Sequence, residues 1–156
     1  MKGGVIVGEI ERIVDQHRRS FAGGAWHGPA VFELLRGVSA AEAAARPLTG
    51  RHSIAEIALH VAAWEEVAKR RLAGERVELT TEQDWPPVQG GDEQAWARAL
   101  ETLERRHREL QQAIAGLSEK RLDERVPGQE YSVYHMLHGV VQHGLYHAGQ
   151  IALLRR

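Results

Sequence analysis

Residues 53–72 read SIAEIALHVAAWEEVAKRRL, and this stretch decides the fold. Ser53 and Glu56 form a capping box, in which each side chain accepts a hydrogen bond from a backbone N–H that the first helical turn leaves exposed. The apolar face of the expected helix consists of Ile54, Ile57, Val61, Trp64 and Leu72. These residues recur every three or four positions, as on one side of an α-helix, and Gly74 ends the pattern. The stretch therefore predicts an amphipathic helix that buries one face.

Three further stretches show the same helical periodicity. The first, residues 6–21, is interrupted at Gly23, and Pro29 then suits the first turn of a short resumed helix. The second, residues 92–117, begins at an aspartate that can cap a helix. The third runs from residue 132 to about residue 155 and begins at a serine. The chain therefore has four long helical stretches, and nothing in it has the alternating pattern of a strand.

The segments between the expected helices indicate how the helices are connected. Residues 75–91 contain Trp-Pro-Pro and Gly-Gly, which cannot continue a helix, so this segment is the expected long connection. A faint repeat at an offset of 79 residues matches residues 37–39 (GVS) with 116–118 (GLS), and the capping serines of the second and fourth helices with each other. Each half would be a helix, a short helical turn that begins at a serine, and a serine-capped helix. We therefore expect an all-α fold, a four-helix bundle with short extra helical turns in the connections.

Length and charge exclude several classes of protein. The chain has 156 residues, the size of one domain, and we treat 1–156 as a single domain. A net charge of -1, with acidic and basic residues interspersed, provides no basic surface for nucleic acid or an anionic membrane. No apolar run approaches the roughly 20 residues that span a bilayer, and Glu9 and Glu11 interrupt the pattern of a secretory signal. We expect a cytoplasmic protein with no nucleic-acid or membrane partner. The absence of cysteine excludes disulfides and thiolate ligands.

Histidine is the unusual component of the composition, with nine residues. His143 and His147 lie four positions apart on the last expected helix, so both side chains lie on one face and can bind one ion. The spacing alone is weak support, because roughly half an i,i+4 pair arises by chance at this histidine content. Both residues, however, lie on the apolar stripe of their helix, and His60 lies on that of the 53–72 helix. Buried imidazoles need partners, either hydrogen-bond acceptors in the core or a shared metal ion.

A shared metal ion is the functional interpretation of these three histidines. Three neutral imidazoles leave coordination positions open for water or a substrate atom, as in reactive metal sites. Zinc suits this ligand set, although imidazole also binds nickel, copper and iron. We therefore predict that His60, His143 and His147 hold one divalent metal ion. Gln150 is a candidate to orient a ligand from outside, and Trp64 a candidate to line the pocket.

Four other histidines are not expected to be ligands of the ion. His17 and His107 lie on the inward stripes of their helices, where a hydrogen-bonded core role is favoured over a ligand role. His135 and His138 are rotated away from the direction of the two histidines that follow them, at about 100° per residue. We expect them at the surface or in an interface.

Two stretches that contain the three histidines resemble a known protein family. Residues 53–64 (SIAEIALHVAAW) and residues 143–151 (HGLYHAGQI) resemble the DinB-like superfamily of bacterial metal-binding bundles. The resemblance covers nearly the whole chain, including residues 25–29 (AWHGP). It implies a four-helix bundle of up-down-down-up topology, a site formed by the same three histidines, and a homodimer. All three ligand positions are intact in this sequence.

The resemblance also implies a class of activity. Characterised members include transferases and isomerases that use low-molecular-weight bacterial thiols, and some hydrolases. This implies a metal-dependent enzyme that acts on a small-molecule thiol or electrophile, because a bound zinc or nickel ion lowers the pKa of a thiol or water. No carboxylate has an unmistakable general-base position, so no catalytic acid or base is assigned. The alternatives are a non-catalytic metal-binding or stress-related interaction module that acts as a dimer, and a bundle whose site no longer binds metal. An open cavity beside the ligands favours the enzyme, and a closed site favours the module.

Overall fold

In the computed structural model, which describes residues 7–155, the regular structure is helical. The helices are α1 (Glu9–Ala22), α2 (Val31–Leu35), α3 (Ala40–Ala44), α4 (Ile54–Leu72), α5 (Thr81–Asp84), α6 (Glu93–Ala115), the 3-10 helix η1 (Glu119–Asp123) and α7 (Val133–Leu154). No strand forms within residues 7–155, where Arg125 and Ser132 make only an isolated β-bridge. The predicted all-α fold is therefore confirmed.

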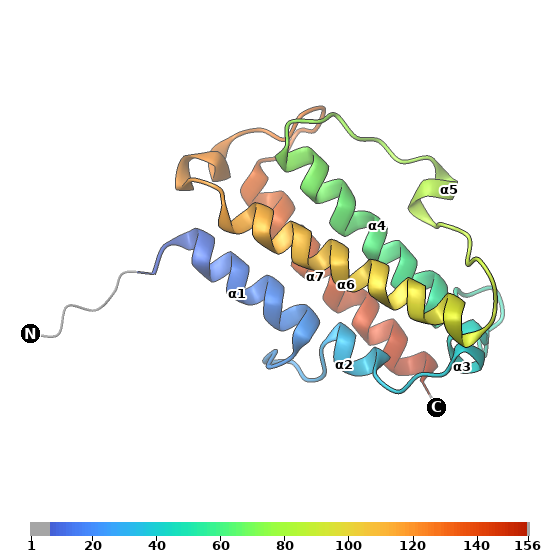
Figure 1. Ribbon diagram of the computed structural model, residues 1–156. Coiled ribbons are helices and arrows are strands. Elements are labelled where there is room, and N and C mark those ends of the chain that lie inside the picture. Colours follow the sequence, from blue (N-terminus) through green and yellow to red (C-terminus); the bar gives the residue numbers. More distant parts are fainter. Residues whose placement is uncertain (1–6, 156) are drawn as a thin grey trace, which may run out of the picture.

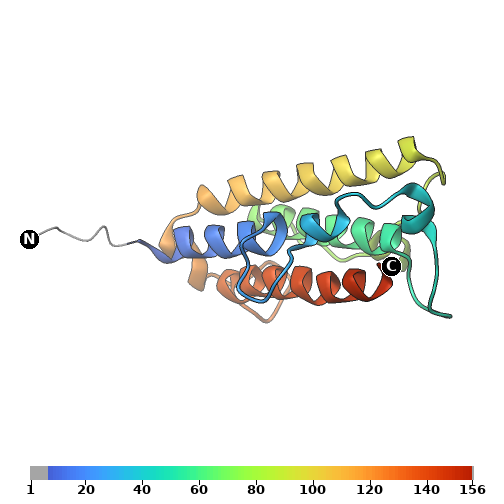
Figure 2. The same cartoon turned by 90° about the horizontal axis from the view of Figure 1, so that it is seen from below.

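The four long helices α1, α4, α6 and α7 lie alongside one another (Figures 1 and 2). Helix α4 packs against α6 and α7, and α1 packs against the same two helices. The short helices α2 and α3 lie in the connection between α1 and α4. Because α4 and α7 are neighbours, side chains on their facing sides meet inside the molecule. In this described part of the chain, no helix is both long enough and apolar enough to cross a bilayer.

Three of the long helices begin at the capping residues that the sequence indicates. The Ser53 hydroxyl accepts a hydrogen bond from the Glu56 N–H at 3.2 Å, and the Glu56 carboxylate accepts one from the Ser53 N–H at 2.7 Å. The Asp92 carboxylate caps α6 by accepting from the Ala95 N–H at 2.7 Å, and Ser132 caps α7. Each such cap stabilises a helix by about 1 kcal/mol. Local hydrogen-bonding chemistry therefore sets where these helices start.

The connections differ from expectation in two places. Pro29 lies before the resumed helix and not in its first turn, because Ala30 is the residue that precedes the first helical position of α2. The 75–91 connection contains one helical turn, α5, which was not expected. The Thr80 hydroxyl and the Gln83 side chain form a capping box that holds this turn until Trp85-Pro86 ends it. Ile6, the first residue of the 6–21 stretch, lies outside the described residues.

The short serine-initiated turns of the repeat are both present. Ser39 precedes α3, and its hydroxyl accepts a hydrogen bond from the Glu42 N–H. Ser118 precedes η1 at the matching position in the second half of the chain. The expected extra helical turns in the connections are therefore confirmed.

The apolar core consists of two groups of buried side chains, and on three helices a buried polar residue comes between the two groups. The residues in chain order are Ile13, His17 and Phe21 on α1, Val61, Glu65 and Leu72 on α4, and Leu103, His107 and Leu110 on α6. Each fully buried aliphatic side chain contributes roughly 1.5–3 kcal/mol to folding. The polar residues lie where further aliphatic side chains would be expected, so they need partners of their own.

The three polar residues are one another's partners. Nε2 of His17 lies 2.9 Å from one Glu65 carboxylate oxygen, and Nδ1 of His107 lies 3.4 Å from the other. The two imidazole rings stack with their centroids 4.1 Å apart. Burial alone would raise the pKa of the Glu65 carboxyl, but the two imidazoles lower it to about 2. The predicted hydrogen-bonded core role of both histidines is confirmed, and Glu65 is the acceptor that links α1, α4 and α6.

We expect Glu65→Gln to destabilise the fold at neutral pH and to lose this effect in acid. A carboxyl whose pKa is lowered on folding stabilises the protein above its ordinary pKa, here 4.5, and loses that contribution as the pH falls to about 2. The whole shift corresponds to about 3 kcal/mol. Urea unfolding at pH 7, 4 and 2.5 measures the difference from wild type, which should shrink as the pH falls.

Glu66→Gln is the matched control for this experiment. Glu66 is the next residue on α4, and its carboxylate pairs with Lys69 near the surface. Such a pair contributes less than about 1 kcal/mol. A Glu65→Gln difference that stays constant between pH 7 and pH 2.5 would contradict the assignment.

Candidate metal centre

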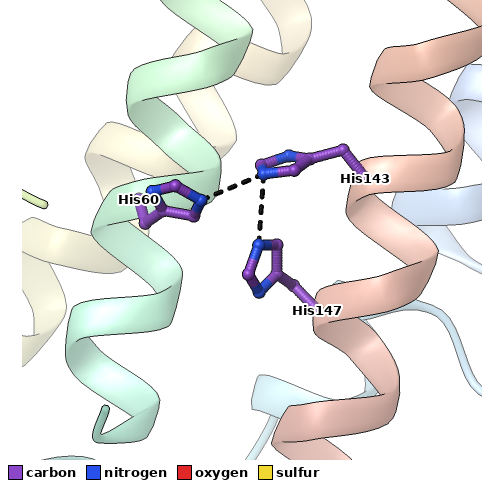
Figure 3. A group of neighbouring side chains, drawn as sticks. All are labelled: His60, His143 and His147. Carbon is purple, nitrogen blue, oxygen red and sulfur yellow. Dashed lines mark hydrogen bonds between the residues drawn. The ribbon is translucent and has the colours of Figure 1, made fainter. Parts of the chain in front are cut away.

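The three predicted ligands come together between two helices. His60 projects from α4, and His143 and His147 project from α7 toward it (Figure 3). Nε2 of His143 lies 3.0 Å from Nε2 of His60 and 3.1 Å from Nε2 of His147. One ring nitrogen from each residue lies within 4.8 Å of the others. His60 and His147 are buried, and His143 is half-buried.

Hydrogen bonds on the far side of two rings determine where their protons are. Nδ1 of His60 lies 2.7 Å from the backbone oxygen of Asp84, which can only accept, so the Nδ1–H donates to it. Nδ1 of His147 donates in the same way to Oε1 of Gln150 at 2.8 Å, as predicted for Gln150. A neutral imidazole carries only one N–H, so Nε2 of both rings is unprotonated and carries a lone pair. Both lone pairs are directed at Nε2 of His143.

This donor set fits a metal ion. Neutral His143 has at most one proton to offer, and two lone pairs face it, so one contact is left without a proton unless a cation supplies the positive charge. Three imidazole nitrogens at the usual 2.0–2.1 Å from a tetrahedral ion lie about 3.3 Å apart. The two close Nε2···Nε2 distances of 3.0 and 3.1 Å are near this value.

The protonation equilibria also suit ligands. Burial, together with the neighbouring His147 and His60, lowers the pKa of His143 to about 4. Burial likewise lowers the pKa values of His60 and His147, against the hydrogen bonds that raise them. All three imidazoles are therefore neutral at pH 7. Neutral imidazole is the form that binds a metal ion.

The long connection between α4 and α6 supplies the outer contacts of the site. The Trp85 ring stacks on His60 at a centroid distance of 3.8 Å and on His52 at 3.5 Å. One Asp84 carboxylate oxygen accepts a hydrogen bond from the Trp64 Nε1–H at 2.7 Å and lies 3.2 Å from Nδ1 of His60. These contacts hold the His60 ring in place and shield it from water.

A cavity of about 530 Å³ opens beside the three histidines. Its wall is mostly apolar, and Trp64 is part of it, as predicted. The remaining lining residues are Val67, Ala68, Arg71, Asp84, Trp85, Tyr131, His135, Met136, Gly139, Val140 and Tyr146. The volume falls in the range of sites that hold small organic molecules. A molecule in this cavity can approach the Nε2 atoms.

Several site residues were missed from the sequence. Asp84, Trp85 and Tyr131 lie in connecting segments without periodicity, and no local pattern relates them to His60. Arg71 has a usable signal, because it follows His60 by eleven positions and therefore lies on the same side of α4. Glu65, His17 and His107 also have donor atoms within 4.8 Å of one another, but they already hydrogen-bond one another in the packed core.

The comparisons with known proteins agree with this picture. Residues 25–151 match the family model described as the DinB superfamily, and this range includes all three histidines. No curated protein and no solved structure matched the chain. The matched range covers well over half of the sequence. The chain therefore belongs to the DinB superfamily.

Proposed function

We propose that His60, His143 and His147 bind one divalent metal ion, zinc or nickel, and that the protein is a metal-dependent enzyme of the thiol-dependent transferase or hydrolase class. The observation that carries the proposal is the convergence of the three Nε2 atoms. In His60 and His147 the Nδ1–H donates to an acceptor, so the Nε2 atom is unprotonated and presents a lone pair. The cavity beside them favours an enzyme over a closed structural site. The family assignment supports both parts.

The chain's own residues have definable roles in such a site. A bound divalent cation would lower the pKa of a thiol or water in contact with it. The Asp84 backbone oxygen and the Gln150 side chain orient His60 and His147, which makes the ligand geometry ready before binding. Trp85 covers one face of His60 and keeps water from it. The apolar wall of the cavity suits the body of an electrophile. We assign no catalytic acid or base, since the Asp84 carboxylate is already engaged by Trp64.

The proposal includes the architecture that the family implies, a single domain over residues 1–156 folded as an up-down-down-up bundle. The segment between α4 and α6 supports it, because in Figure 1 this segment runs back along the length of α4. A connection between two parallel neighbouring helices needs such a return. The proposal also places the protein in the cytoplasm. It includes no membrane or nucleic-acid partner, because a net charge of -1 with interspersed charges provides no basic surface for either.

The proposed homodimer is a separate prediction. Tyr146 and Leu153 lie seven residues apart on α7, on one side of the helix, and are 67% and 82% exposed. Two such apolar side chains on one face suit contact with a second copy. Sedimentation velocity at micromolar concentration should give the mass of a dimer, and Leu153→Glu should shift it toward the monomer. A wild-type protein that sediments as a monomer would refute the dimer.

We expect His143→Ala to abolish stoichiometric metal binding while the helical content is retained. The substitution removes the central ligand, whose Nε2 contacts both other ligand nitrogens. His138→Ala, on the same helix and near Glu9, is the matched control and should keep the metal. Elemental analysis after purification without chelators measures the metal, and circular dichroism measures the helix content. Full metal occupancy in His143→Ala would overturn the ligand assignment.

Turnover distinguishes the enzyme from the non-catalytic module. The metal-loaded protein should conjugate a small thiol to 1-chloro-2,4-dinitrobenzene or hydrolyse 4-nitrophenyl acetate faster than the same protein stripped with a chelator. His143→Ala, which should lack the metal, serves as the second control. If fully loaded protein is silent across a wide set of thiols, electrophiles and esters, the enzyme part of the proposal is wrong, and the metal-binding module is favoured.

A further inference from the structure

Arg71 is a buried cation in the wall of the cavity that holds the three histidines. Arg71 is only 6% exposed. One guanidinium nitrogen, Nη1, donates to the Tyr131 hydroxyl at 2.8 Å, and Nη2 donates to the backbone oxygen of Val77 at 2.8 Å. Among the residues that the structure describes, the Nε–H finds no acceptor. Both hydrogen-bond partners are neutral, and within residues 7–155 the guanidinium makes no ion pair with an aspartate or glutamate.

An unpaired buried guanidinium needs an explanation. Arginine cannot lose its proton in a protein, so burial cannot be relieved by neutralisation. Removing such a charge from water without a countercharge is strongly unfavourable. The neighbouring Arg70 shows the usual arrangement, since it faces solvent and pairs with Glu75. Within the described chain, no other lysine or arginine is classed among the buried residues. The countercharge for Arg71 can therefore come from a molecule that enters the cavity.

The cavity also determines where on that molecule the negative charge must be. In the metal-free protein, the Asp84 carboxylate at the histidine end would repel an anion and so favours the Arg71 end for it. Arg71 is the only lysine or arginine in the described wall, so one negative charge matches it better than a doubly charged phosphate. The wall between the two ends is apolar, and the Trp64 ring lies 5.8 Å from the Arg71 guanidinium carbon and 5.9 Å from the His143 ring. One small molecule beside this indole can therefore approach both groups.

We propose that the cavity binds a monocarboxylate with an apolar or aromatic body, whose carboxylate pairs with Arg71 while its opposite end faces the three histidines. The planar guanidinium presents N–H donors that match a carboxylate. The inference deepens the proposed function by naming the substrate class, and it rests on that function only for the reaction at the histidine end. The pairing with Arg71 itself does not require a metal ion.

The test uses two probes of the same shape, 2-naphthoate and 2-naphthamide, which differ in charge. Isothermal titration calorimetry on chelator-treated wild-type protein should show at least tenfold tighter binding of the carboxylate than of the amide. In Arg71→Met this preference should disappear, and in Arg71→Lys part of it should return. Arg70→Met is the matched control and should keep the full preference, because Arg70 pairs with Glu75 at the surface.

A cavity-filling variant covers the case in which Arg71→Met does not fold. Gly139 lines the cavity, and a side chain added there would meet no atom within 4 Å at its first carbon. Gly139→Leu should therefore weaken the binding of both probes at least tenfold while Arg71 is intact. Equal affinity of wild type for the two probes, no binding of either probe, or undiminished carboxylate preference in folded Arg71→Met would overturn the inference. Carboxylate preference in a protein that takes up no metal would refute the proposed function and leave this inference standing.

Discussion

Three imidazole nitrogens facing one another in a buried space are the constraint on which the account depends. The backbone oxygen of Asp84 and the side-chain oxygen of Gln150 each accept a hydrogen bond from the Nδ1–H on the far side of a ring, so the Nε2 atoms at the centre carry lone pairs. Lone pairs directed at one another repel, and His143 can relieve only part of that repulsion while its low pKa keeps it neutral. A cation at this point removes the conflict. The fold therefore presents a site whose own hydrogen bonds prepare it for a metal ion.

The rest of the structure holds these rings at the required spacing. Helix α4 carries His60 and Arg71 on the side that faces the cavity, and Glu65 on the side that faces α1 and α6. The Glu65 cluster joins three helices through charge-assisted contacts and separates two apolar groups, so it favours one alignment of α4 over a shifted one. Because His60 is five residues from Glu65, that alignment also sets the height of His60 opposite α7. Core and site are thus connected through one helix.

Much of the fold could be predicted because its signals are local. A capping residue such as Ser53 or Asp92 acts within one helical turn, and inward histidines stand out against an aliphatic stripe. Glu65 was missed because nothing in the sequence distinguishes this glutamate from the solvent-facing glutamate beside it on α4. Only the positions of α1 and α6 make it internal. Asp84 was missed because it reaches the site through the path of the 75–91 connection, which has no periodicity to read. Contacts that depend on the route of a loop are not visible in a linear pattern.

X-ray absorption at the metal edge, together with an anomalous difference map from crystals of the metal-loaded protein, tests the central claim most directly. The account predicts one ion per chain, with three imidazole nitrogens at about 2.0–2.1 Å, from His60, His143 and His147, and at least one further ligand on the cavity side. An ion held elsewhere in the chain, or fully loaded crystals in which fewer than these three histidines contact it, would contradict the account.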